Sequence, residues 1–363
     1  MSDLLLACIS QGQLSLEGNG GGQILESTFG RSLRDRAAEI YNRHAWKTQG
    51  RGGQSLSRAL RATPEHDPGD FRIAITSVTR GSHPGELLYT LETDEISGVF
   101  ARDAEGVEKR LFHTADFRVR HLDVHPDGAE IAVSIAYRNG MENLAVLKAD
   151  GSGLTEVTDG DSRDQAPRWA PGPGRRLVFQ SSGMGRDPHG RLARHGPFSI
   201  QQLDLDTGAI ACLAQAARFD FVAPRIAADG ALYYIRRPNR SAPPPPSLGM
   251  AFQQTALLPF RILWVIGKLI NLSVEQRTGT PLVPGKGIAE QDFTTPRSWV
   301  LMRQNGDSPE QAETIAEGVR AFDWASDGSV VYCDGFAVHR IPAGGGAAAK
   351  VLAGENIDFI AAV

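Results

Sequence analysis

This sequence of 363 residues has few cysteines and no segment that looks like a secretory leader. The cysteines are Cys8, Cys212 and Cys333. Because they are odd in number, far apart and without a CxxC pair, neither a disulfide framework nor a zinc site is expected. The first residues lack a basic segment, and the apolar run Leu4–Ile9 ends before Gln11, which is typical of a strand. The sequence therefore predicts a protein of the reducing cytoplasm.

A strong excess of charge is also missing, since the formal net charge is -4. This value gives no general attraction to nucleic acid or to an anionic membrane, so such a partner would need a local basic patch. The Gly-x-Ser-x-Gly elbow, the P-loop and the dinucleotide fingerprint are absent from the sequence. Glycine and proline, by contrast, are frequent, with 40 and 21 residues. That composition favours short strands joined by tight turns.

A repeat runs through the chain. Four segments share an apolar stretch, a turn and a second apolar stretch: Val119–Val133, Gln165–Phe179, Phe221–Ile235 and Val319–Tyr332. Each predicts two strands joined by a turn in which a glycine takes a positive φ, namely Gly128, Gly174, Gly230 and Gly328. A second pattern, a strand ending in Asp-x-Gly before another strand, follows at Leu144–Val157 and Ile200–Leu213, and more weakly at Val300–Ile315 and Val338–Leu352. Together they predict four-stranded units of roughly 40–50 residues, the size of a propeller blade.

Three phrases carry a family resemblance: HPDGAEIAVS from His125, LKADGSGLTEVTDG from Leu147 and APRWAPG from Ala166. They resemble the WD40-like repeat of the TolB propeller and its relatives, over Phe71 to Val363. The resemblance implies a β-propeller fold whose repeats are structural. It also makes protein partners plausible, because TolB-like propellers occur in bacterial multiprotein systems, some centred on ATPases. Two differences from TolB are the missing periplasmic signal and the missing separate N-terminal domain.

The expected fold is all-β, a six-bladed β-propeller formed by residues 1–363 as a single domain. Five blades are predicted at Phe71–Asp116, 117–160, 161–216, 217–318 and 319–355. The sixth is expected to join the last strand, Ile357–Val363, to the hairpin of Leu4–Ile9 and Gln13–Glu17, because each alone would leave an open edge. Two insertions are predicted: a helical and flexible one at 28–69, and a Pro-rich and apolar helical one at 238–296 in blade four.

The first insertion begins with an amphipathic helix predicted over Phe29–Gln49. Between Arg31 and Arg61, eight basic residues stand against only Asp35 and Glu39. One interpretation is an anion-facing patch for nucleic acid, phospholipid or an acidic partner, formed by Arg31, Arg34, Arg36, Arg43 and Lys47. The other is a helix packed on the side of the propeller with a solvated charged face. Nucleic acid is not the expected partner, because no aromatic residues alternate with these charges to stack on bases.

The second insertion contains the proline tract Ser241–Ser247 and then the apolar stretch Met250–Val274. Pro259, Arg261 and Lys268 interrupt that stretch, so it is not expected to span a bilayer. It could dock into a partner's groove, lie in a membrane interface as a peripheral contact, or fold back onto its own propeller. The stiff proline spacer favours outward docking. The predicted contact residues are Phe260, Ile262, Leu263, Trp264, Ile266, Leu269 and Ile270.

Candidate chemical sites are few. Asp159, Asp161 and Asp164 resemble part of a calcium loop but lack its sixth-position Gly and twelfth-position Glu, which favours a turn between blades. The remaining candidates, as metal ligands, are His113, His121, His125, His189 and His195. Core or turn packing is the simpler explanation for these histidines. No catalytic residue, cofactor or metal set is predicted. The expected function is a non-catalytic scaffold or adaptor in a multiprotein assembly, and the alternative is a propeller lyase or hydrolase, metal-assisted, acting on a sugar or lactone at the channel mouth.

Overall fold

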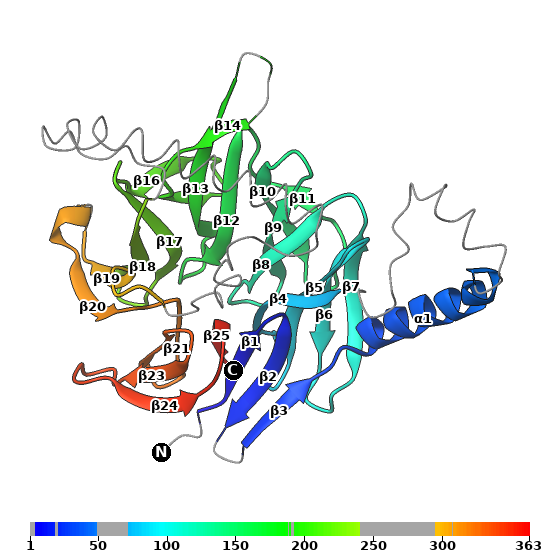
Figure 1. The fold of residues 1–363 in the computed structure, drawn as a ribbon. Helices are drawn as coiled ribbons and strands as arrows, with labels where there is room; N and C mark the ends of the chain where they lie inside the picture. The colour runs from blue at the N-terminus through cyan, green and yellow to red at the C-terminus, as the bar shows by residue number, and fades with distance from the viewer. Residues whose placement is uncertain are drawn as a thin grey trace, which may run out of the picture. The chain divides into compact units, whose positions relative to one another are not determined.

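The computed structural model describes residues 4–18, 21–48, 72–187, 189, 192–239, 295–306 and 308–363. The chain divides into two units, one formed by 1–241 with 295–363 and the other by 242–294. The second unit falls outside the described residues, and the contact residues predicted there, Phe260 to Ile270, fall outside with it. The first unit is built from antiparallel sheets (Figure 1).

The described residues form four sheets of four strands and one of nine. One small sheet holds β4 (Ile73–Arg80), β5 (Leu87–Thr93), β6 (Ser97–Arg102) and β7 (Glu108–Thr114). Another holds β17 (Phe219–Ile226), β18 (Leu232–Pro238), β19 (Val300–Gln304) and β20 (Glu313–Glu317). A third holds β21 (Ala321–Trp324), β22 (Val330–Cys333), β23 (Ala337–Ile341) and β24 (Ala349–Ala353). These strands match the predicted hairpins, and residues 239–299 connect β18 to β19. The insertion predicted at 238–296 lies mostly outside the described residues and stays a prediction.

The nine-stranded sheet consists of two antiparallel groups. The first is β8 (Arg118–Val124), β9 (Glu130–Ala136), β10 (Glu142–Lys148) and β11 (Thr155–Glu156). The second is β12 (Ser162–Trp169), β13 (Arg176–Arg186), β14 (Leu192–His195), β15 (Ser199–Asp204) and β16 (Ile210–Ala214). A single parallel pair, Glu142 with Arg163, joins the groups.

The two ends of the chain share the remaining sheet, in the order β25 (Ile357–Ala362), β1 (Leu6–Ser10), β2 (Gln13–Gly18) and β3 (Gly21–Leu25). Leu6 pairs with Ala362 and Cys8 with Ile360, so the predicted union of the last strand with the first hairpin is confirmed. The fourth strand, β3, was not predicted, because its glycines are poor strand formers. Its partner β2 supplies the backbone hydrogen bonds that hold it extended.

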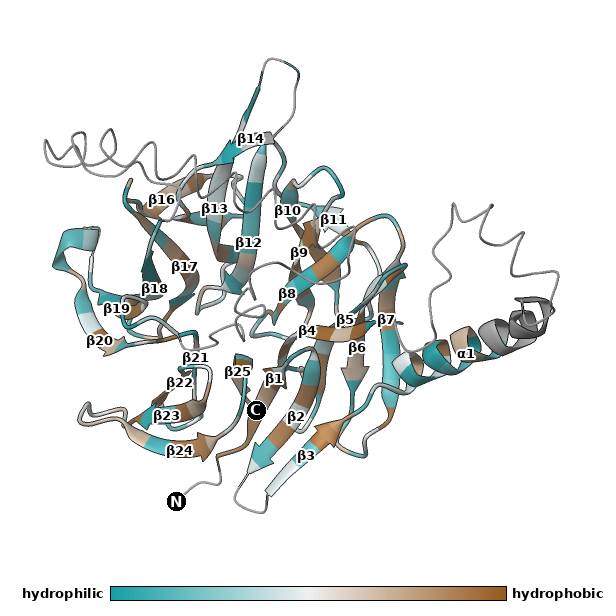
Figure 2. Cartoon of the chain, viewed as in Figure 1, coloured by the Kyte–Doolittle hydropathy of each residue, from teal (hydrophilic) through white to brown (hydrophobic). Residues whose placement is uncertain are grey.

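Apolar clusters lie between successive sheets and hold them together. One joins β1 and β25 to the β4–β7 sheet through Ile9, Val78 and Phe100. Similar clusters continue from sheet to sheet, and the last joins Val331 and Val338 back to Ile360 of β25. In Figure 2, β1 and β9 are coloured as hydrophobic, whereas β12 is largely hydrophilic. Each sheet therefore packs against the next one, and the last sheet packs against the first.

The predicted turn glycines are confirmed at three of four positions. Gly128, Gly230 and Gly328 have φ of 75°, 85° and 79°, a region that residues with a Cβ rarely adopt. In the remaining turn the prediction for Gly174 was wrong, because the positive φ, 107°, belongs to Gly172. The proline on each side of Gly172 fixes the register of that turn, since Pro171 and Pro173 cannot themselves take positive φ.

The helix predicted over Phe29–Gln49 is present as α1 (Thr28–Thr48). Its first turn is anchored by Glu108 of β7, which accepts hydrogen bonds from the Thr28 and Phe29 amides at 3.2 and 2.9 Å. Tyr89 also donates to Glu108. Burial raises the pKa of this carboxyl, but these hydrogen bonds outweigh it and lower the pKa overall. A carboxylate at a helix N-terminus also complements the helix dipole. No helix among the described residues is long and apolar enough to cross a membrane.

Candidate interaction surface

The strands of the first unit have two unlike ends. At one, the short-turn end, innermost strands turn back through brief loops such as 125–129, 227–231 and 325–329. At the other, the long-connection end, the chain makes its long excursions, at 26–72, 187–198 and 239–299. Both segments that the sequence singles out, 28–69 and 238–296, therefore leave the sheets from the same end. The hairpin of β13 and β14, with His189 and His195, extends there too (Figure 1).

Three innermost strands carry the same bulge. His121, Ala166 and Ala223 have φ of 50°, 51° and 54°, and each lies where the pairing register of its strand shifts. A bulge re-aims the side chains that follow it. Two residues after each bulge stands a charged side chain, Asp123, Arg168 or Arg225. The bulges therefore place charged groups along the inner edges of the sheets.

These inner charges form ion pairs between neighbouring strands. Asp123 of β8 accepts from Arg168 at 3.0 Å and from the Trp169 amide at 2.8 Å. Asp323 of β21 lies 2.8 Å from Arg225 and accepts from the Ala362 amide at 3.0 Å. Each carboxylate thus joins its own strand to the next one.

Arg225 is largely enclosed, with 15% of its side chain exposed. Burial, aided by the neighbouring Arg168, lowers the pKa of Arg225 to about 10, while Asp323 opposes that shift. The guanidinium therefore stays charged at neutral pH and needs its carboxylate partner.

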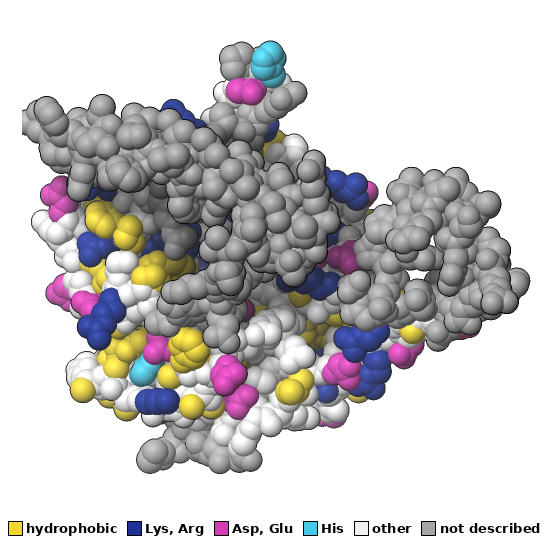
Figure 3. Space-filling view, viewed as in Figure 1, with side chains coloured by type: hydrophobic (Ala, Val, Ile, Leu, Met, Phe, Trp, Pro, Cys, Tyr) yellow, Lys and Arg dark blue, Asp and Glu magenta, His cyan; other side chains and the backbone are white. Residues whose placement is uncertain are grey.

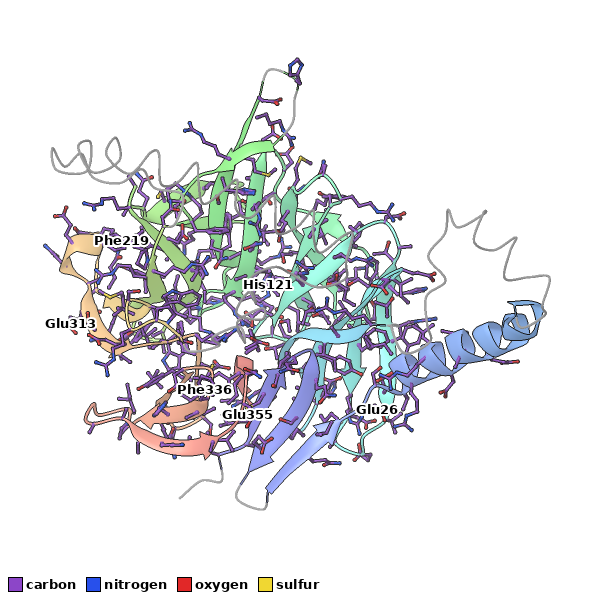
Figure 4. The ribbon with its side chains drawn as sticks, in the orientation of Figure 1. Glu26, His121, Phe219, Glu313, Phe336 and Glu355 are labelled. Atoms are coloured by element: carbon purple, nitrogen blue, oxygen red, sulfur yellow. The ribbon has the colours of Figure 1, made fainter. Side chains whose placement is uncertain are left out.

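A second polar layer surrounds His121, which Figure 4 shows in the middle of the sheets. The His121 Nδ1 lies 2.8 Å from the Ser134 hydroxyl. Burial lowers the pKa of His121 to about 4, while Glu142 opposes the shift and the nearby arginines add to it. His121 is therefore neutral at pH 7, where it accepts or donates one hydrogen bond at each ring nitrogen.

Beside His121, polar side chains connect strands of the nine-stranded sheet to β17 of the next sheet. Glu142 accepts from Arg163 at 2.9 Å and from Gln165 at 2.6 Å. Gln180 donates to Gln165 at 2.9 Å and accepts from the Ala223 amide at 2.7 Å. Since these groups satisfy one another, the network holds β10, β12, β13 and β17 in register.

No group of three or more His, Cys, Asp or Glu side chains with metal-binding geometry occurs within the described residues. Asp159 and Asp161 lie in the connection before β12, where Asp161 pairs with Arg186 at 2.5 Å, and Asp164 within β12 accepts from Ser181. His125 packs edge-on against Trp169 at 4.7 Å between ring centroids. Within the described residues, Asp161, Asp164 and His125 therefore have partners in the fold.

Arginines and aromatic rings gather at the long-connection end of β17, β18 and β19. Arg236 lies over the Phe219 ring at 5.1 Å, and Arg237 lies over Trp299 at the same distance. Arg218 and Arg297 are exposed beside them. Figure 3 shows hydrophobic and basic side chains together over β17 to β19, at the left of the view. No single stretch of the sequence indicates this group, which we call the basic tip: Arg218, Phe219, Arg236, Arg237, Arg297 and Trp299.

The basic helix residues are only partly placed. Arg31 and Arg34 lie 2.6 and 3.5 Å from Glu26, which neutralises part of their charge, while Arg36 is exposed. The side chains of Arg43 and Lys47 are outside the description. The anion-facing patch on α1 stays a prediction.

No family model matches the chain, and no curated protein matches it. Among solved structures, TolB from Acinetobacter baumannii covers 99% of this chain with a TM-score of 0.53 and 11% identity. An oligogalacturonate lyase from Vibrio parahaemolyticus covers 76% of the chain and 64% of its own length, with a TM-score of 0.43 and 11% identity. The tricorn protease covers 96% of the chain and 34% of its own length, with a TM-score of 0.48 and 12% identity.

The order of sheets and this likeness define the class of the fold, a β-propeller. Within that class the fold is TolB-like, since the likeness to TolB extends over 99% of the chain. The chain spans 66% of the length of that TolB, and at 11% identity the likeness shows the fold alone.

Proposed function

We propose that this protein is a non-catalytic adaptor that uses the long-connection end of its propeller to bind other proteins. The observation that carries the proposal is the unequal distribution of chain between the two ends. The excursions at 26–72 and 239–299 leave from one end, and the basic tip stands beside the second of them. Loops on a rigid scaffold are where binding residues concentrate.

The scaffold proposed here has six blades in a single domain. The four small sheets supply four, and the nine-stranded sheet counts as two, because only the pair Glu142 with Arg163 joins its halves. The blade shared by β25 and β1 then fixes both ends of the chain, which stiffens the ring for binding.

The proposed partners are proteins of a cytoplasmic multiprotein assembly, and an ATPase-centred assembly is the form that the TolB-like repeats suggest. The apolar stretch 250–274 is the proposed docking element, with peripheral membrane contact as its alternative use. Its sequence supports both uses, because Trp264 and Leu263 are large apolar anchors next to the basic Arg261.

The test changes Leu263→Ala and Trp264→Ala together in the full chain. Outward docking predicts that co-purification of the host partner, or binding to anionic vesicles, is lost while the melting temperature is unchanged. Folding back onto the propeller predicts instead a stability loss of several kcal/mol, since each buried anchor contributes roughly 1.5–3 kcal/mol. Reduced stability with intact binding would contradict the docking role.

The enzyme alternative is supported by one observation: of the bulges at His121, Ala166 and Ala223, the one at His121 carries a side chain that can transfer a proton, and it lies in the polar centre. Residues held at positive φ cluster at active sites. Metal analysis of the purified full chain separates the two functions, because a stoichiometric divalent cation would favour the metal-assisted lyase or hydrolase over the adaptor.

A further inference from the structure

The basic tip has more positive charge than its surroundings neutralise. Its four arginines stand at the end of one sheet with two carboxylates, Asp220 and Glu317. Asp220 is already used, because Arg237 lies 3.4 Å from it and the Phe198 amide donates to it at 3.1 Å. Arg218, Arg236 and Arg297 form no ion pair with any carboxylate that the structure describes.

The register of the strands explains how the tip is shaped. Asp220 pairs with Arg237, and Phe219 pairs with Pro238. Since successive residues of a strand point to opposite faces, Arg236 and Arg237 emerge on opposite faces of β18. Arg236 covers Phe219 on one face, and Arg237 covers Trp299 on the other. The charged groups thus border the sheet's end on both sides.

The composition of the tip is that of a protein-binding surface. Arginine and tryptophan are enriched among the residues that dominate binding energies at interfaces, and here each ring already orders its arginine. Phe219 is 36% exposed, so part of its ring remains available to a partner.

The chain's own insertions do not match the tip in charge. Residues 240–294 contain five basic residues, Arg240, Arg261, Lys268, Arg277 and Lys286, against Glu275, Glu290 and Asp292. The segment from Arg31 to Arg61 is more basic still. Charge complementarity therefore requires an acidic occupant from another molecule. One face of each ring is covered by a guanidinium, which leaves less ring surface for stacking nucleic-acid bases.

We propose that the basic tip binds an extended acidic segment of a partner protein, whose carboxylates pair with Arg218, Arg236 and Arg297. This inference rests on the proposed adaptor function and names the chemistry of the partner. The acidic segment crosses the end of β17, β18 and β19. Its carboxylates form ion pairs with the three guanidiniums that have no carboxylate partner among the described residues.

The experiment titrates a fluorescein-labelled peptide of eight glutamates against the full chain at low salt. The variant Arg218→Gln, Arg236→Gln and Arg297→Gln keeps the pair of Arg237 with Asp220. A matched control, Lys109→Gln, Lys148→Gln and Lys350→Gln, removes the same charge from exposed sites outside the tip. The tip variant is expected to raise Kd about tenfold, and the control less than about twofold.

Equal effects of the two variants would overturn the proposal, because binding would then follow overall charge. Tighter binding of oligo-dT than of the peptide, lost in the tip variant, would assign the surface to nucleic acid and overturn it as well. A changed oligomeric state of the tip variant in sedimentation would assign the tip to a second copy. Co-purification of the host partner is measured separately. If no partner co-purifies with the unchanged chain or with either variant, the adaptor function is refuted. The peptide titration tests only whether the basic tip binds acidic segments.

Discussion

The chain reverses direction at both ends of the strands, through short similar turns at one end and through connections of varied length at the other. At the short-turn end, Asp127, Asp229 and Asp327 each accept a hydrogen bond from the amide two residues later, at 2.8, 3.0 and 3.1 Å. Each carboxylate therefore accepts a hydrogen bond within its own turn and stabilises that turn. At the long-connection end the chain varies from sheet to sheet, and charged side chains such as Arg236 remain without a carboxylate among the described residues.

This difference separates the short turns, which recur from sheet to sheet, from the long connections, which differ from sheet to sheet. The repeated end contains short turns that any TolB-like propeller needs, so substitutions there should affect stability. The varied end contains extra chain that the sheets do not need for pairing, so substitutions there should affect binding. The inner ion pairs belong to the frame that supports both ends.

Deleting Ile357–Val363 should have the largest effect, because it removes the frame common to both ends. β25 covers Leu6 and Cys8 of β1, and Ile360 is fully buried. Losing a strand from the core should exceed the usual stability of a domain, about 5–15 kcal/mol, and leave the protein unfolded or aggregated. Circular dichroism and thiol alkylation are the measurements.

The cysteines report on that closure directly. Burial raises the pKa of both Cys8 and Cys333 to about 12, whereas Cys212 is exposed. In the intact chain only Cys212 should react quickly, since the thiolate is the reactive form. The deletion should make all three react. Ile360→Val is the matched mild variant, expected to cost about 1 kcal/mol and leave the buried thiols protected. A deleted chain with two protected thiols would refute the closure.

Changing Asp323→Asn should have the next largest effect. It leaves the buried Arg225 guanidinium without its carboxylate, which costs about 3–5 kcal/mol of unfolding free energy in comparable pairs. Chemical denaturation measures it. Asp358→Asn is the control, since its pair with Arg320 at 2.6 Å is more exposed, at 41% and 25%, than the pair of Asp323 with Arg225, and should contribute less than about 1 kcal/mol. Equal losses from the two variants would contradict the special role of the buried pair of Asp323 with Arg225.

Changing Asp327→Asn should have a smaller effect, confined to the short-turn end. Hydrogen bonds from Ser329 and Arg340 lower the pKa of Asp327 to about 2. Because the folded pKa is depressed, the stabilisation is fully present above the unfolded pKa near 4 and is lost as pH falls toward 2. The variant should melt about 1–2 °C lower at pH 7 and at the same temperature as the unchanged chain near pH 2. A difference that persists at low pH would refute this origin.

Much of the frame could be predicted from sequence because its signals are local. Turn residues such as Gly128 and Asp127 stand next to the strands that they join, and the apolar runs identify those strands. β3 was missed because Gly21 and Gly22 disfavour a strand, and only pairing with β2 overrides that preference. The prediction for Gly174 was wrong because Pro171 and Pro173, on the two sides of Gly172, fix the turn so that Gly172 takes the positive φ.

The candidate surface was harder to predict because it depends on distant residues meeting. Aligning the repeats places Asp123, Arg225 and Asp323 in one column, five residues before Gly128, Gly230 and Gly328. That alignment signals charged positions shared by the innermost strands. The basic tip combines Phe219, Arg236 and Trp299, which lie far apart in the sequence, and no single stretch signals it. The tip became visible only from the register of β17 with β18 and β18 with β19.

Hydrogen–deuterium exchange on the full chain, with and without its purified host partner, tests most directly whether the long-connection end is the binding surface. The account predicts new protection at the connections 137–141, 215–218 and 296–299, with exchange unchanged in the turns 125–129, 227–231 and 325–329. Protection confined to those turns, with the connections unchanged, would contradict it.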